Sequence, residues 1–361
     1  MADLTVAKLE VGVYDVPTDR PEQDGTLDWD KTTVVTVEPV ASDGTRGLGF
    51  TYGTGACARL VHDVLASEVE GKDVLDVEAS WRAMVHAIRN LGRPGISSMA
   101  IAAVETALWD LKARCLEQPL FRLLGSVREA VPVYGSGGFT SYSERELVEQ
   151  LTGWVEQGIP RVKMKIGRDA AADVERVRAV RKAVGDEIEL FVDANGAYDR
   201  KEALRQAREF EELGVTWYEE PVSSDDLDGL ARLREDTQLE ITAGEYGYDL
   251  FYFERMLEKR AVDVLQLDVS RCAGFSEWLR GVGLAQGFSV PTSAHCAQSL
   301  HAHVACATET RHLEYFHDHE RVDRLLFDGV LDPRDGELRP DPERPGLGLE
   351  LRRIDAQRYA A

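Results

Sequence analysis

Three carboxylates recur at a fixed spacing in the second half of the chain. Asp193, Glu219 and Glu245 are each 26 residues from the next, the length of one strand followed by one helix. Each comes at or just after a short apolar run, so the three acids would stand at one height on neighbouring parallel strands. A single acid there could simply cap the next helix. Three together would repel one another without a cation, and an oxygen-only set favours Mg²⁺ first and Mn²⁺ second.

Two lysines lie upstream of these acids. Lys163 and Lys165 take alternate positions of a predicted strand, so both point to one face while Met164 points to the other. We expect the lysines to face the carboxylates. Adjacent ammonium groups lower each other's proton affinity, which favours a general base among them. A salt bridge between Lys163 and a neighbouring acid is the alternative.

Two further residues mark later strand ends. Asp268 ends the sixth predicted strand and His295 follows the seventh. A carboxylate bonded to an imidazole fixes its tautomer, so this pair is a candidate general acid–base. Glu314, in the eighth strand, could offer the substrate a proton or a hydrogen bond.

Most of the eight histidines are expected to be structural, including the group His301, His303 and His312. His317 and His319 flank Asp318, a spacing that fits either a metal site or a polar loop.

The elements that would hold these residues alternate regularly from Val131 onward. Ser143 with Glu146, and Asp199 with Glu202, fit the capping-box pattern of helix starts. Strands alternating with helices predict a TIM-type parallel α/β barrel, (β/α)7-8. A doubly wound sheet is the alternative, but no Gly-x-Gly-x-x-Gly follows these strands. The expected strands are Val131–Gly135, Arg161–Ile166, Ile188–Val192, Val215–Tyr218, Leu239–Ala243, Val262–Leu267, Phe288–Thr292 and His312–Tyr315.

The chain before the barrel has mixed character. Thr5–Val16 and Thr32–Val40 alternate like strands, with the acidic, turn-rich stretch Thr18–Asp30 between them, and Ser97–Cys115 predicts a buried helix. We expect an α+β domain at residues 1–126, the barrel at 127–330, and a tail at 331–361. The tail is rich in Pro and Gly, and we expect it to pack back on the first domain.

Composition excludes several classes of function. The net charge of -22 argues against a nucleic-acid partner, because such binding requires a basic face. No stretch approaches the roughly 20 apolar residues of a membrane span, so we expect no membrane partner. The 5 cysteines form no Cys-x-x-Cys pair, which disfavours a disulfide framework and makes the cytoplasm the expected compartment.

Taken in order, these motifs resemble the enolase superfamily, and within it the mandelate racemase subgroup, over essentially the whole chain. The segments that carry the resemblance are Glu105-Thr-Ala-Leu-Trp-Asp-Leu-Lys-Ala, Lys163-Met-Lys165, Asp193-Ala-Asn195-Gly, Glu219-Glu220-Pro221, Ala243-Gly-Glu245, Asp268-Val-Ser-Arg-Cys-Ala-Gly274, His295 and Pro345-Gly-Leu-Gly348. Any one is a weak signal, whereas the ordered set is specific. The resemblance implies a capping domain at the N-terminus, with loops near Thr18–Asp30 and Tyr52–Gly55 closing over the substrate.

The resemblance also implies how the site would work. It makes Asp193, Glu219 and Glu245 the ligands of Mg²⁺, and Lys165 the base, assisted by Lys163. The reaction would begin with removal of the proton next to a carboxylate.

On the other face of the substrate, the resemblance places His295 with Asp268 as acid–base. The muconate lactonizing subgroup has a lysine at the position of Asp268, so aspartate selects the mandelate racemase side. Glu314 resembles the family's electrophilic glutamate. We expect Asn195 and Tyr246 to contact the substrate, although Tyr246 could equally serve packing.

The predicted substrate is a small carboxylate, and dehydration of an acid sugar to a 2-keto-3-deoxy acid is the favoured reaction. Racemisation or epimerisation of an α-hydroxy acid is the alternative, followed by a muconate-type cycloisomerase. A Schiff-base aldolase using Lys165, or a non-catalytic sugar-acid binding protein, is more remote. Such relatives commonly assemble, so we expect a homo-oligomer.

Overall fold

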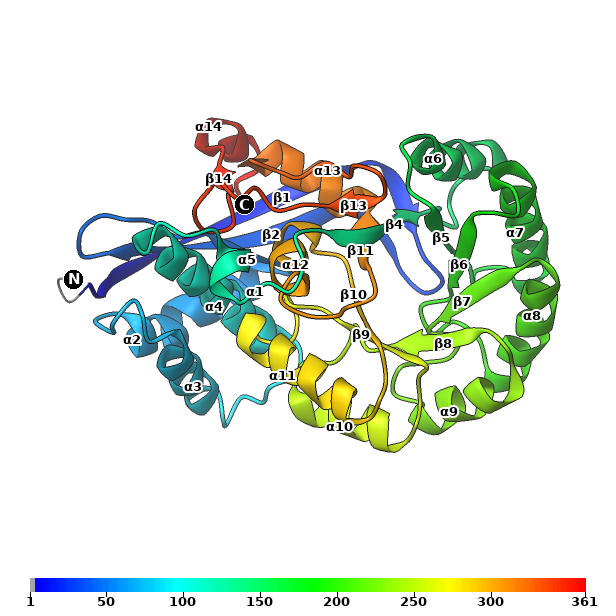
Figure 1. Cartoon of the computed structure of the whole chain (residues 1–361), viewed down its shortest axis with the longest axis horizontal. Coiled ribbons are helices and arrows are strands. Elements are labelled where there is room, and N and C mark those ends of the chain that lie inside the picture. The colour runs from blue at the N-terminus through cyan, green and yellow to red at the C-terminus, as the bar shows by residue number, and fades with distance from the viewer. Residues whose placement is uncertain (1–3) are drawn as a thin grey trace.

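A closed ring of parallel strands forms the larger part of the molecule. The computed structural model describes residues 4–361, and in this part of the chain the ring closes because β11 pairs with β4. Helices surround the ring on its outside (Figure 1). The predicted TIM-type barrel is therefore confirmed. Its strands are β4 (Val131–Gly137), β5 (Arg161–Lys165), β6 (Glu189–Asp193), β7 (Val215–Glu219), β8 (Glu240–Ala243), β9 (Val264–Leu267), β10 (Thr292–Ala294) and β11 (Leu313–Phe316).

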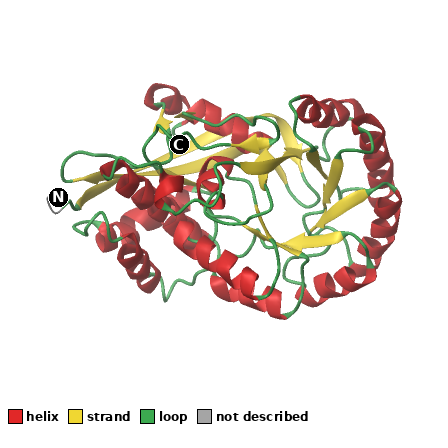
Figure 2. Cartoon of the chain, viewed as in Figure 1, coloured by secondary structure: helices red, strands yellow, loops and turns green. Residues whose placement is uncertain are grey.

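A helix follows each strand of the ring (Figure 2). Ser143 and Glu146 start α6 with the reciprocal capping box that the sequence predicts. Asp199 caps α8 by accepting hydrogen bonds from the backbone N–H groups of Lys201 and Glu202. The helices are α6 (Glu144–Glu156), α7 (Ala170–Val184), α8 (Arg200–Glu212), α9 (Leu227–Asp236), α10 (Leu250–Glu258), α11 (Phe275–Gly287), α12 (Gln298–Ala305) and α13 (His317–Leu326).

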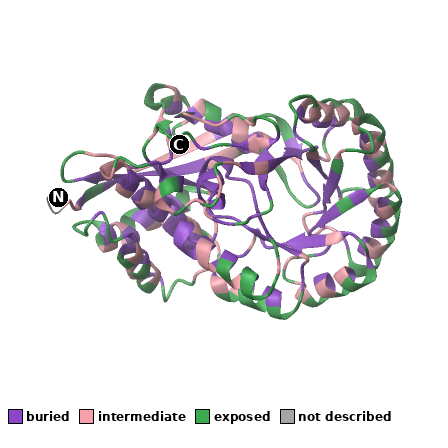
Figure 3. Cartoon of the chain, in the orientation of Figure 1, coloured by how far each residue is buried: buried purple, intermediate pink, exposed green. Residues whose placement is uncertain are grey.

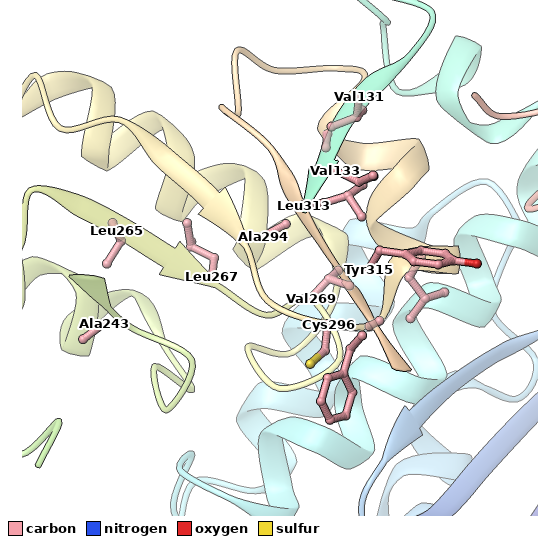
Figure 4. Close-up of a cluster of buried hydrophobic side chains, with 14 of the residues drawn as sticks. Val131, Val133, Ala243, Leu265, Leu267, Val269, Ala294, Cys296, Leu313 and Tyr315 are labelled. Carbon is pink, nitrogen blue, oxygen red and sulfur yellow. The ribbon is translucent and has the colours of Figure 1, made fainter. Parts of the chain in front are cut away.

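Alternation along the strands separates two buried regions. Apolar side chains on the outer faces pack under the helices, and Figure 4 shows part of this layer around Val131, Leu267 and Leu313. The inside of the ring contains the aromatic cluster of Tyr134, Phe191 and Trp217. Figure 3 shows the strands of the barrel as mostly buried. Polar side chains that point inward above this aromatic floor are therefore held in a dry, rigid setting.

The first domain is an antiparallel sheet covered by helices. β1 (Val6–Gln23), β2 (Asp28–Ala41) and β3 (Gly49–Tyr52) pair in that order. The long helix α4 packs on β2 and β3, in agreement with the buried helix predicted there. The helices of this domain are α1 (Gly55–Leu60), a π-helical turn (Val61–Leu65), α2 (Ala66–Val69), α3 (Val77–Ala87), α4 (Ile96–Cys115) and α5 (Leu120–Leu123).

The expected loop Thr18–Asp30 is mostly strand, so that prediction was wrong. β1 and β2 continue as a hairpin through most of this stretch, and only residues 24–27 turn. The acidic residues were misleading because they support the hairpin: the Asp24 carboxylate accepts hydrogen bonds from the backbone N–H groups of Thr26 and Leu27. The carboxylate of buried Glu22 accepts one from the Trp29 indole across the hairpin, at 2.8 Å.

The expected strand Phe288–Thr292 is also wrong, because β10 begins only at Thr292. The Phe288 N–H still donates to the carbonyls of Leu284 and Ala285 at the end of α11. Ser289 then takes a left-handed conformation with φ 58°, which turns the chain toward the barrel. The alternating apolar residues in this stretch therefore belong to a helix exit.

The tail contacts both parts of the molecule. β13 (Glu337–Leu338) pairs with the barrel strand β4, and β14 (Glu350–Leu351) pairs with β12 (Phe327–Asp328). Farther on, α14 (Arg353–Ala356) and a 3₁₀ turn (Gln357–Tyr359) lie against the first domain (Figure 1). The Arg353 guanidinium contacts the Glu38 carboxylate, and the Ala361 N–H donates to the Val13 carbonyl at 3.0 Å.

Within residues 4–361, the helices are all too short or too polar to cross a lipid bilayer.

Candidate active site

The three predicted carboxylates do converge at the C-terminal end of the barrel. Asp193 and Glu219 are the last residues of β6 and β7 and face each other in register. Glu245 lies two residues beyond the end of β8. Each of the three offers an oxygen that lies within 4.8 Å of the others, and all three residues are buried. One small cation could therefore contact all of them.

A glycine makes the position of Glu245 possible. Gly244 has φ 134°, which L-amino acids avoid, and a Cβ built there would lie 2.3 Å from the Gln266 carbonyl oxygen. The chain can thus turn directly above β9 and deliver Glu245 to the other acids.

The two lysines point into the same cluster, as predicted. Lys163 Nζ lies 2.5 Å from Glu219 Oε1, 2.9 Å from Glu314 Oε1 and 3.5 Å from Asp193 Oδ2. Lys165 Nζ lies 2.5 Å from Asp193 Oδ2. Lys163 therefore does both things considered for it: it faces the carboxylates, and it forms salt bridges with them.

The predicted effect of one lysine on the other is outweighed. Burial lowers the pKa of Lys165, and Lys163 lowers it further, but Asp193, Glu314 and Glu219 together outweigh both, so the net pKa is above its usual value. Burial also lowers the pKa of Lys163, but the carboxylates of Glu219 and Glu314 raise it, and the net pKa is well above its usual value. The expected lowering of the lysines' proton affinity is outweighed because carboxylates lie next to each ammonium, and a cation bound by Asp193 and Glu219 would weaken that effect.

Asp268 and His295 form the predicted pair. His295 follows β10, and its Nδ1 lies 2.8 Å from Asp268 Oδ2. Burial favours the neutral acid, but the hydrogen bond with His295 and the charge of Arg271 hold the pKa of Asp268 below its usual value. Ser270 donates from its N–H and its hydroxyl to Asp268 Oδ1, both at 2.7 Å. The fixed carboxylate leaves Nε2 of His295 facing the cluster, 3.1 Å from Glu245 Oε2.

Glu314 reaches the cluster from β11, and its neighbours define its state. Its Oε1 accepts a hydrogen bond from the Ser136 hydroxyl at 2.5 Å and forms an ion pair with Lys163 Nζ at 2.9 Å, while Oε2 accepts a hydrogen bond from the Cys296 N–H at 3.1 Å. Burial opposes ionisation, but Lys163 and His295 outweigh it and hold the pKa of Glu314 below its usual value. In this arrangement Glu314 is a hydrogen-bond acceptor, and its role toward the substrate stays a prediction.

Asn195 and Tyr246 both line a cavity of about 570 Å³ next to the carboxylates. Asn195 has φ 46°, and its buried Oδ1 has no hydrogen-bond partner among the described residues. Tyr246 lies under the Arg271 guanidinium at 5.2 Å, so its ring also serves packing. The cavity continues outward between the loops that follow β7 and β8, as far as Tyr252 and Arg255 on α10.

Sequence reasoning missed three residues of this site. Arg271 Nη1 lies 3.0 Å from Glu245 Oε1. Burial and the charge of Glu245 raise the pKa of Glu220 well above its usual value, and its buried Oε1 has no partner among the described residues. Cys296 places its Sγ 3.3 Å from Nε2 of His295. Each of the three lies next to a predicted site residue in the sequence or in the same motif. That proximity was the one sequence feature that could have pointed to them.

The other histidines separate into two groups. His301 accepts from the Val269 N–H, His303 lies at the Leu347 carbonyl and His312 at the Ser293 hydroxyl, all in the buried interior, as expected of structural residues. His317 and His319 lie on α13, so the polar-loop alternative is wrong, and His319 stacks on Tyr52. His317 forms a group with Asp19 and Glu22 at the cap hairpin.

The donor set at the barrel mouth fits a hard divalent ion. Three buried carboxylates supply only oxygen, and the Oε2 atom of Glu245 has no hydrogen-bond partner among the described residues. Burial and Asp193 raise the pKa of Glu219, a sign of the repulsion that a cation would relieve.

Two family models match this chain. The mandelate racemase/muconate lactonizing enzyme N-terminal domain matches residues 8–125, and the enolase C-terminal domain-like model matches residues 146–355. The chain therefore belongs to the mandelate racemase/muconate lactonizing enzyme family of the enolase superfamily, and it is a lyase or isomerase of that superfamily.

Individual relatives agree with this assignment. The chain is 33% identical over 332 residues to arabinonate dehydratase of Saccharolobus solfataricus, covering 88% of each chain. A mandelate racemase/muconate lactonizing enzyme-like protein from Rubrobacter xylanophilus superposes with a TM-score of 0.97 at 55% identity, covering 99% of this chain and 100% of that one. A racemase from Streptomyces coelicolor A3(2) with bound magnesium superposes with a TM-score of 0.92 at 30% identity, covering 98% and 99%.

Proposed function

We propose that this protein dehydrates an acid sugar, an aldonate or aldarate, to a 2-keto-3-deoxy acid. The observation that carries the proposal is the placement of two proton-transfer groups around one carboxylate cluster. Lys165 reaches the cluster from β5, and His295 reaches it from the end of β10 on the other side of Glu314 and β11. A substrate carboxylate at the cluster would have one group on each face of its α-carbon.

The proposed metal ligands are Asp193, Glu219 and Glu245. A divalent ion held there, Mg²⁺ or alternatively Mn²⁺, would supply positive charge where the substrate carboxylate gains its second negative charge. Lys163 adds a fixed ammonium beside Glu219 and Glu314, which favours binding of the same anionic end of the substrate.

The side chains then divide the proton transfers. Lys165, in its neutral form, accepts the proton from the α-carbon, and the electron pair of that bond moves toward the carboxylate. His295 donates the proton from Nε2 to the β-hydroxyl, the carbon–oxygen bond breaks, and water leaves. Asp268 keeps Nδ1 of His295 protonated, so that Nε2 remains the atom that gives and regains the proton. The resulting enol becomes the 2-keto acid by tautomerisation.

Racemisation or epimerisation is the second candidate, because the same two groups can exchange a proton on the α-carbon. A relative with 30% identity is described as a racemase, which keeps this candidate open. A muconate-type cycloisomerase has less support, since Asp268 stands where that subgroup has lysine. A Schiff-base aldolase or a non-catalytic sugar-acid binding protein would have no use for the buried trio of carboxylates.

The deciding experiment is incubation with Mg²⁺ in D₂O against a panel of acid sugars and α-hydroxy acids, followed by proton NMR. We expect 2-keto-3-deoxy products, lost in Lys165→Ala and in Glu219→Ala. Epimers without keto acid would establish the second candidate. Turnover that persists without divalent metal would refute both, and is the result expected of a Schiff-base aldolase.

We further propose that the protein acts as a homo-oligomer in the cytoplasm on a small carboxylate. Five free thiols support a reducing compartment. Sedimentation analysis of the purified protein tests the assembly, and a single species with the mass of one chain would contradict it.

A further inference from the structure

Three side chains of different chemistry meet at one point beside the carboxylate cluster. Cys296 Sγ lies 3.3 Å from His295 Nε2 and 3.4 Å from Glu314 Oε2, and those two atoms are 3.7 Å apart. All three residues are buried. Around a tetrahedral ion with bonds of about 2.0–2.3 Å, neighbouring ligand atoms lie roughly 3.3–3.8 Å apart. The triangle therefore has the size that one small ion requires.

We propose that His295, Cys296 and Glu314 form a second, inhibitory metal site that takes a soft or borderline divalent ion such as Zn²⁺ or Cd²⁺. Imidazole and thiolate ligands select such ions, whereas Mg²⁺ prefers the all-oxygen set of Asp193, Glu219 and Glu245. Each site thus has its own ion preference.

The backbone holds the thiol in this place. Cys296 and Ala297 have φ 45° and 41°, two consecutive residues in the left-handed region. Non-glycine residues rarely adopt it, and the surroundings must enforce it. Two hydrogen bonds do so here, from the Cys296 N–H to Glu314 Oε2 at 3.1 Å and between His301 Nδ1 and the Cys296 carbonyl at 2.8 Å.

A fourth ligand is within reach. Glu245 Oε2 lies 3.1 Å from the same His295 nitrogen, and among residues 4–361 it makes no hydrogen bond of good geometry. In protein loaded with Mg²⁺, where Glu245 would be occupied, a water molecule can take the fourth position. The proposed site is thus three side chains plus one exchangeable ligand.

The chemistry of binding balances without any redox partner. The metal replaces the proton on Cys296 Sγ, the sulfur electron pair forms the metal–sulfur bond, and the proton leaves to solvent. His295 binds through the Nε2 lone pair while Nδ1 keeps its proton toward Asp268.

Binding would block catalysis, because an Nε2 bound to metal can neither give nor take a proton. This consequence rests on the proposed role of His295, whereas metal binding itself depends only on the three ligands. The two can therefore be tested separately.

The test is a titration of Mg²⁺-loaded protein with Cd²⁺, followed by the ultraviolet thiolate-to-cadmium charge-transfer band. We expect the band to saturate at one equivalent. Cys296→Ser keeps a hydroxyl at this position but offers a poor soft-metal ligand, and should weaken Cd²⁺ binding at least about tenfold and abolish the band. The matched control is Cys115→Ser, at a half-buried thiol on α4, which should leave the band unchanged.

An unchanged band in Cys296→Ser, or no band in the unaltered protein, would overturn the proposal. Should Cys296→Ser not fold, protection of Cys296 from iodoacetamide by Cd²⁺, mapped by mass spectrometry, decides the question, and alkylation at an unaltered rate would count against the site. Binding of Cd²⁺ without loss of turnover would leave the metal site standing and instead refute the role of His295.

Discussion

The hydrogen bond between Asp268 and His295 controls which ring nitrogen can transfer a proton. An ionised carboxylate at Nδ1 can only accept, so Nδ1 carries the hydrogen and Nε2 faces the cluster. The hydrogen bonds from Ser270 keep the carboxylate itself from turning. The orientation of the imidazole is thus decided by a residue that need not touch the substrate.

Asp268→Asn should therefore reduce turnover by about 10- to 100-fold, because an amide can present a donor to Nδ1 and favour the wrong tautomer. Deuterium exchange at the α-carbon catalysed by Lys165 should survive, since that side chain lies on the opposite face. Kinetics together with NMR exchange in D₂O measure both. Asp186→Asn, at an exposed position, is the control. Equal loss of exchange and turnover would contradict separate roles for the two faces.

Among individual residues, the sequence correctly predicted the positions of those that are set by the repeating strand–helix units of the barrel. Asp193 and Glu219 end strands, and the spacing of the strand–helix units was enough to place them together. Arg271 and Cys296 were missed because they lie in loops, where side-chain direction depends on individual backbone angles. The left-handed turn at Cys296 is one such case.

Single glycines control how the strand ends turn into loops. Gly244→Ala would force a Cβ against the Gln266 carbonyl at a left-handed position, so we expect a loss of at least about 2 kcal/mol in unfolding free energy and weaker Mg²⁺ binding through Glu245. Gly283→Ala is the matched control: its Cβ would meet nothing within 4 Å on the exposed side of α11. It should be neutral or stabilise by roughly 0.5–1 kcal/mol. Urea unfolding and calorimetric Mg²⁺ titration compare the two, and equal effects would contradict this reasoning.

A buried acid joins the first domain to the barrel. Asp323 on α13 accepts hydrogen bonds from the hydroxyls of Tyr52 on β3 and Ser299 on α12. Burial raises its pKa from 3.8 to about 7, so folding favours its protonated form. Protonated Asp323 therefore contributes fully to the unfolding free energy below the pKa of this residue in the unfolded chain. That contribution is lost as pH rises through about 7.

The unfolding free energy should accordingly fall between about pH 4 and pH 7, and Asp323→Asn, which cannot ionise, should reduce that fall by roughly 3 kcal/mol. Urea unfolding across this pH range measures it. An identical slope in the variant would show that other buried acids, such as Glu105 with its pKa raised by burial to about 7, cause the dependence.

Both misplaced elements were predicted from local sequence pattern, and in both the neighbouring elements decided the structure instead. Period-two alternation placed a strand at Phe288–Thr292, but the end of α11 and the turn at Ser289 compete for the same residues. The stretch Thr18–Asp30 was assigned to a loop from its acids and turn-forming residues. Pairing between β1 and β2 overrode that local preference, since a ladder satisfies the backbone along its whole length.

Divalent metal should stabilise the molecule as a whole. A ligand that binds only the folded state adds about 2.7 kcal/mol at a hundred times its Kd. We expect Mg²⁺ to raise the melting temperature of the protein, and EDTA to reverse the rise. Glu219→Gln should remove most of the effect, because it deletes one of the three clustered charges. A full Mg²⁺ response in Glu219→Gln, seen by differential scanning calorimetry, would exclude the cluster as the binding site.

The contact of Arg353 and Ala361 with Glu38 and Val13 has a consequence for biosynthesis. Residues near the start of the chain leave the ribosome long before their partners in the tail exist, and the whole barrel is made in between. The part of the first domain's sheet that the tail covers in the finished protein therefore stays exposed until the tail has been synthesised. A nascent chain stalled before residue 350 should expose that surface to chaperones and proteases, whereas release of the tail closes it.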